Sequence, residues 1–105
     1  MGKIIPIETN QRHVRAWLDI VSKTEALINV AIAVDAKGDE VARQVAEEIR
    51  NQEMLTLRHQ GFEMPEGFSF KPEVTEQEID GKTFLVTMYR FVESDWKREI
   101  MGRDK

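Results

Sequence analysis

The chain has 105 residues and a mass of 12.2 kDa, a length typical of a single domain. Hydrophobic residues make up 41% and charged residues 32%, a composition that can build a core and excludes a disordered chain. There is no cysteine, which excludes disulfides, thiol nucleophiles and cysteine-based zinc sites. The formal net charge of −4 argues against attraction of the whole protein to nucleic acid or an anionic membrane.

Targeting signals are not apparent in the sequence. The first residues, up to Pro6, lack the apolar segment of a secretory signal. The most apolar stretch, residues 26–34, is much shorter than the about 20 residues that a membrane-spanning helix needs. We therefore expect a cytoplasmic protein without a membrane segment.

The N-terminal part predicts a short strand followed by a helix. Residues 3–7 are apolar and β-branched, and Pro6 places any strand there at a sheet edge, because proline cannot donate to a β-ladder. Apolar residues then recur at spacings of three and four within 10–22, which indicates an amphipathic helix that Thr9 or Asn10 could cap. These residues are Val14, Trp17, Leu18 and Val21.

Residues 25–34 fit two structures. Ile28, Val30 and Ile32 alternate with smaller residues, which favours a strand. The alternative is a helix, because alanine favours helices and no glycine or proline separates this segment from the preceding one.

A long helix is predicted over about residues 39–57. Asp39 is a good N-cap, and apolar side chains follow at helical spacing. Oppositely charged pairs such as Glu47 and Arg50 support it at a separation of three residues.

The C-terminal part predicts an antiparallel hairpin with strands at about residues 69–79 and 82–92. Asp80-Gly81 between them is the dipeptide that favours a type I′ turn. A two-residue turn pairs Ile79 with Lys82 and places Val74 opposite Thr87. The second strand is apolar on both faces and should be an inner strand. The first carries acidic residues and should be a charged edge.

A short helix at about residues 95–101, capped by Ser94, completes the predicted order of elements. The sequence therefore predicts one small α+β domain, residues 1–105, in which several helices accompany a C-terminal hairpin.

Catalytic and metal-binding motifs are not recognisable. His13 and His59 are the two histidines, and their spacing matches no helical ligand pair. No serine lies in a nucleophile motif, and no phosphate-binding glycine loop is complete. We predict no catalytic residue, metal or cofactor. A small enzyme or ligand-binding domain without recognisable motifs stays an alternative.

Two features suggest binding to another protein. The loop 61–68 carries Phe62, Met64 and Phe68, which either anchor a partner or fold back onto the sheet. The hairpin edge carries acidic side chains that either dock a basic partner or keep the edge soluble. These acids are Glu73, Glu76, Glu78 and Asp80.

The function predicted from these features is that of a small non-catalytic protein that binds another macromolecule, as a protein-binding, regulatory or inhibitory module. A homodimer is expected to cover the two apolar faces of the hairpin. The alternative is a nucleic-acid-binding accessory protein that uses Arg12, Arg15 and Lys23 on a basic first helix. Such a helix would need more bases and some side chains that read nucleotides, so nucleic acid is the less favoured partner.

Overall fold

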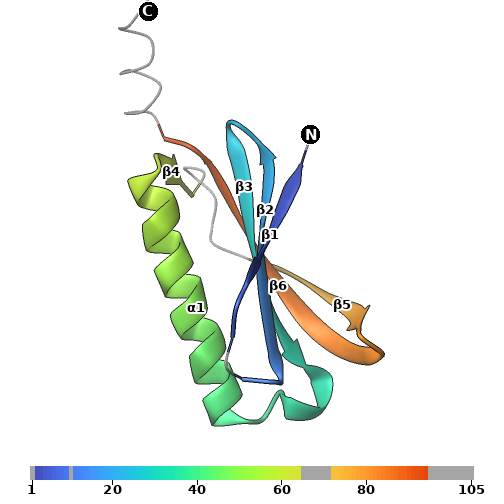
Figure 1. Cartoon of the computed structure of the whole chain (residues 1–105). Helices are drawn as coiled ribbons and strands as arrows, with labels where there is room; N and C mark the ends of the chain where they lie inside the picture. The colour runs from blue at the N-terminus through green and yellow to red at the C-terminus, as the bar shows by residue number, and fades with distance from the viewer. Residues whose placement is uncertain (1, 10, 65–71, 95–105) are drawn as a thin grey trace, which may run out of the picture.

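The structure, a computed structural model, describes residues 2–9, 11–64 and 72–94 (Figure 1). An antiparallel sheet runs in the order β1-β2-β3-β6, and both β4 and β5 pair with the far side of β6. The elements in chain order are β1 (Lys3–Ile7), β2 (Val14–Ser22), β3 (Glu25–Ala33), the 3₁₀ turn η1 (Val34–Ala36), α1 (Glu40–His59), β4 (Phe62–Glu63), β5 (Glu73–Ile79) and β6 (Lys82–Glu93).

The predicted fold class is wrong. A six-stranded sheet with one helix forms in the described residues, in place of several helices with a hairpin. The predicted helix at 10–22 is strand β2, which pairs with β1 on one side and β3 on the other. The hydroxyl of Thr9, expected as a helix cap, instead donates to the carbonyl of Val14 at 2.9 Å.

The physical reason is that this segment satisfies two periodicities at once. Val14 and Leu18 belong to a helical stripe with Trp17, but they also belong to a period-two series with Ala16 and Ile20. In the strand, Val14 and Leu18 pack in the cluster under α1, while Trp17 packs in a second cluster on β3 and β6. The strand is favoured because it also buries Ala16 and packs Ile20 against the core, and both of these residues lie off the helical stripe.

Other elements follow the sequence more closely. Residues 25–34, which fit two structures, contain strand β3, and this strand lies between β2 and β6. The long helix is confirmed as α1, and its N-cap Asp39 accepts a hydrogen bond from the N–H of Val41 at 2.9 Å. Strand β1 with Pro6 lies at an end of the strand order, as proline predicts.

The C-terminal hairpin has the predicted register. Ile79 pairs with Lys82 and Val74 with Thr87. Asp80 and Gly81 have φ values of 52° and 79°, as a type I′ turn requires. The first strand begins at Glu73, later than predicted, and the predicted helix at 95–101 lies outside the described residues.

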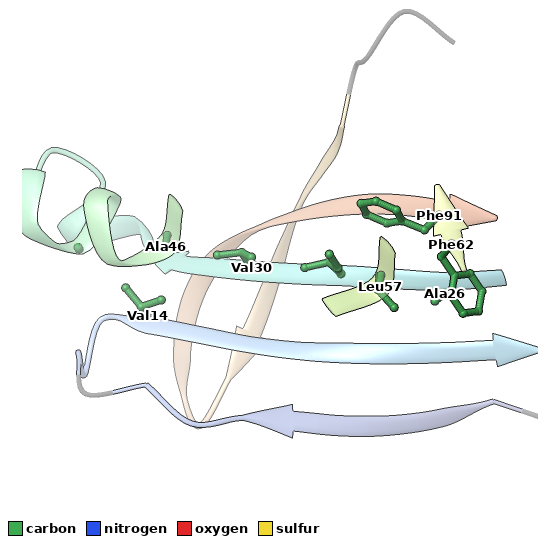
Figure 2. Close-up of a cluster of buried hydrophobic side chains, with 9 residues drawn as sticks. Val14, Ala26, Val30, Ala46, Leu57, Phe62 and Phe91 are labelled. Carbon is green, nitrogen blue, oxygen red and sulfur yellow. The ribbon is translucent and has the colours of Figure 1, made fainter. Parts of the chain in front are cut away.

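The main core lies between α1 and one face of the sheet (Figure 2). The helix packs against β3, β2 and β4. Ala42 and Ala46 present small side chains to the sheet, whereas Leu57 fills the other end of the interface together with Phe62 and Phe91. Each large side chain fully buried here contributes about 1.5–3 kcal/mol to folding.

A second, smaller core lies on the opposite face of the sheet. Phe84 and Val86 of β6 are buried there beside Ala31 and Ala33 of β3. The η1 turn contributes an alanine, and side chains of β2 and β5 pack against the cluster. The sheet therefore buries part of both faces, with a helix over one and η1 beside the other.

The hairpin turn generates a stability prediction. Replacing Gly81 by alanine should lower the free energy of unfolding by about 1 kcal/mol, because a left-handed backbone costs an L-residue roughly 1–2 kcal/mol. Gly38 is the matched control, since a Cβ there meets nothing within 4 Å. Urea denaturation of both alanine variants measures the difference. Equal midpoints for Gly81→Ala and Gly38→Ala would contradict the turn.

Candidate interaction surface

Strand β5 forms an acidic edge of the sheet. Among the described residues it pairs with β6 alone. The side chains of Glu73, Glu76 and Glu78 are exposed, and none of them lies within 4.0 Å of a basic group in the described part of the chain. The structure thus brings three of the predicted acidic residues onto one open strand.

The outer edge of β5 presents main-chain hydrogen-bonding groups. A two-residue turn closes with a hydrogen-bonded pair, which is Ile79 with Lys82. Hydrogen-bonded and non-hydrogen-bonded pairs alternate along an antiparallel ladder. The N–H and C=O groups of Val74, Glu76 and Glu78 therefore point away from β6.

The neighbouring ladder gives the same assignment independently. The N–H of Glu93 donates to the carbonyl of Thr24 at 2.9 Å, so Glu93 faces the β3 side of β6. Counting back by alternation, Met88 faces β5, where it is opposite Glu73. Glu73 consequently faces inward and Val74 outward, in agreement with the assignment from the turn.

The edge at β1 is protected in a different way. The N–H of Ala33 donates to the carbonyl of His13 at 2.9 Å, and alternation from this bond turns the main-chain groups of Trp17 toward β3. Pro6 lies opposite Trp17, so its backbone nitrogen points outward. Because the nitrogen of Pro6 points outward, its missing N–H removes no hydrogen bond between β1 and β2. It does remove one donor from the free edge of the sheet. Strand β5 contains no proline and keeps all its outward donors.

One face of β5 combines apolar and acidic side chains. Val74, Glu76 and Glu78 alternate onto the same face of the strand. Val74 is 56% exposed, a large value for a valine. A strand bound at this edge would meet an apolar side chain and two carboxylates in a row.

Asp80, predicted as part of the acidic edge, has a different setting. Its carboxylate lies 3.7 Å from a guanidinium nitrogen of Arg15 on β2. The same guanidinium lies 5.9 Å from the centre of the Phe84 ring. Beside this contact, the amine of Lys82 lies 4.0 Å from the carboxylate of Asp35. Asp80 therefore differs from the three glutamates of β5 in having a basic side chain nearby, although its own side chain is exposed.

The predicted aromatic loop is only partly described. Phe62 lies in β4 and is 8% exposed, within the main core. Met64 is half-buried and packs against the same core. Phe68 lies outside the described residues. Of the two roles that the sequence allows, Phe62 and Met64 therefore take the packing role.

The three basic residues of the nucleic-acid alternative are spread along the whole length of β2. The helix on which they were placed is a strand. Arg12 precedes β2 and Lys23 follows it, and nine residues separate these ends by about 30 Å at roughly 3.3 Å per residue. Arg15 contacts Asp80 and Phe84. Nucleic-acid binding stays a prediction, but the basic helix on which it depended does not form.

The described residues contain no group of three or more side chains able to hold a metal ion. His13 precedes β2 and His59 ends α1, so the two histidines belong to separate elements. A feature that the sequence did not reveal is a groove of about 440 Å³ between α1, β3 and β6, beside Arg43 and Arg50. Arg43, Glu47 and Arg50 follow one another at spacings of four and three residues, so the sequence already places them on one side of a helix. The sequence does not indicate which strands lie beneath that side.

Comparison of the chain with protein-family models, with curated proteins and with solved structures finds no match. In the described part of the chain, no helix is both long and apolar enough to cross a membrane. The role of the acidic edge is therefore inferred from its own geometry.

Two proline substitutions test the orientation of β5. Glu76→Pro should be tolerated, because it removes an outward N–H, as Pro6 does in β1. Gln77→Pro should lower the free energy of unfolding by roughly 1–3 kcal/mol more, because it removes an inward N–H and leaves the carbonyl of Phe84 without its donor. Thermal or urea denaturation measures both. A larger loss for Glu76→Pro would reverse the assigned orientation.

Proposed function

We propose that the protein binds another protein by pairing β5 with an extended, basic strand of the partner. The observation that carries this proposal is the open edge at Val74, Glu76 and Glu78, where outward main-chain groups coincide with carboxylates that lack a basic partner among the described residues. Strand addition is a common mode of peptide recognition, in which main-chain hydrogen bonds supply affinity and alternate side chains supply specificity.

The carboxylates would select the partner as well as attract it. Cross-strand pairs of opposite charge are favourable and pairs of like charge are unfavourable. Lysine or arginine opposite Glu76 and Glu78 would stabilise the added strand, whereas an acidic strand would be repelled. The same residues that protect the edge from indiscriminate pairing thus favour a basic segment.

A second copy of the chain is a poor occupant of this edge. Two β5 strands paired antiparallel about Glu76 would place Glu76 opposite Glu76 and Glu78 opposite Val74 of the other copy. The central pair has like charges, and each of the flanking carboxylates meets an apolar side chain. The expected homodimer thus finds no support at β5, and a basic partner strand fits better. A module of this kind would act as a regulator or inhibitor by occupying a segment of its partner.

A defined peptide can stand in for the natural partner in a test of this proposal. The probe is a seven-residue peptide of alternating lysine and valine, titrated calorimetrically at low and at high salt. We expect the variant Glu73→Gln/Glu76→Gln/Glu78→Gln to bind it roughly five-fold more weakly at low salt, because the lost charge pairs contribute a few tenths of a kcal/mol each and sum to about 1 kcal/mol. The Glu76→Pro variant should also bind more weakly, because it lacks one outward donor.

The control changes the same number of charges elsewhere. Glu8, Glu40 and Glu48 are exposed and lie outside β5, so replacing all three by glutamine alters the net charge equally. This variant should bind the peptide nearly as the unmodified protein does. Equal weakening of the two triple variants, or no binding by the unmodified protein at low salt, would contradict docking at β5.

A further inference from the structure

The side chains that accompany the outward main-chain groups of β5 are arranged asymmetrically. They belong to Val74, Glu76 and Glu78, and they alternate onto the same face of the strand. Read toward the hairpin turn, this face carries one apolar side chain followed by two carboxylates. The apolar residue is 56% exposed and lies opposite Thr87 of β6. A strand that pairs with this edge therefore meets a different order of side chains in each direction.

The hydrogen-bonding geometry favours one direction of pairing. All five ladders that the structure describes are antiparallel. In an antiparallel ladder each outward residue of β5 exchanges both of its hydrogen bonds with one residue of the added strand, whereas parallel pairing is slightly less stable per residue. Pro72, which directly precedes β5, has no N–H, so the outward donors of this edge begin at Val74. An antiparallel strand can use all of them within one short segment.

We infer that the partner strand runs antiparallel to β5 and has the order basic-x-basic-x-apolar from its N-terminus, where x is a residue on its other face. The two basic residues lie opposite Glu78 and Glu76, and the apolar residue lies opposite Val74. Each of these three pairs is favourable, because two of them join opposite charges and one joins apolar side chains. This order rests on the proposed function, since it specifies the segment that is bound at the same edge. The reverse order, apolar-x-basic-x-basic, makes the poorer ligand.

Two peptides of identical composition and charge test the order. TKTKTVT has the inferred order, and TVTKTKT is its reverse. In antiparallel alignment the reverse peptide places valine opposite Glu78 and lysine opposite Val74, so it loses one charge pair and one apolar pair. It should therefore bind the unmodified protein roughly three-fold more weakly in calorimetric titration at low salt. Equal affinities, or tighter binding of the reverse peptide, would overturn the inferred order and leave docking at β5 standing. Failure of both peptides to bind would overturn the order together with the proposed function.

An exchange of two side chains within β5 should invert this preference. Val74→Glu/Glu78→Val keeps the net charge and moves the apolar side chain to the other end of the same face. Both positions are exposed, so the exchange changes no core residue. The variant should bind TVTKTKT roughly three-fold more tightly than TKTKTVT, because each peptide now meets the mirrored order. An unchanged preference would mean that other side chains select the peptide, which contradicts the assigned pairs.

A nitroxide label reports the direction of binding without a comparison of affinities. With the label on the N-terminus of TKTKTVT, antiparallel pairing carries it to the end of β5 that adjoins the hairpin turn. The amide resonances of Ile79 and Gly81 in the unmodified protein should then broaden more than that of Glu73. Stronger broadening at Glu73 would overturn the antiparallel direction. A bound peptide that broadens neither end of β5 would contradict docking at this edge.

Discussion

One constraint governs this fold: the described residues provide a single helix to cover a sheet of six strands. Helix α1 covers β2 and β3 on one face, and the opposite face is buried in part by its own large side chains and the η1 turn. The first half of β6 and all of β5 lie beyond the helix (Figure 1). The open edge at β5 and the groove beside α1 are both direct consequences of this incomplete cover.

The two edges of the sheet illustrate two solutions to one problem, since unpaired strands invite association. At β1 the solution is the removal of a donor by Pro6, which leaves the inner ladder intact. At β5 the donors remain and carboxylates surround them. A proline removes a donor whatever the partner, whereas carboxylates discourage most partners and favour a basic one. This difference is the physical basis for assigning recognition to β5.

The hairpin and the long helix could be predicted because each depends on local signals, Asp80-Gly81 in one case and Asp39 with its apolar stripe in the other. Strand β2 could not, because Val14 to Val21 fits both the helical and the strand period, and pairing with β1 and β3 decides between them. The acids of β5 are recognisable as a cluster in the sequence. The contact that removes Asp80 from it requires Arg15, which a helix would have placed elsewhere. The groove could not be predicted for a similar reason, because its lining residues come from α1 and from two strands that are distant from it in the sequence.

The central claim is that the main-chain groups of Val74, Glu76 and Glu78 point outward from an open edge. Amide hydrogen exchange resolved by residue measures this directly along β5. Slow exchange at Thr75, Gln77 and Ile79, with fast exchange at the three outward amides, is the predicted alternation. Uniform protection of all six amides, or protection with the opposite alternation, would contradict the open edge and the function inferred from it.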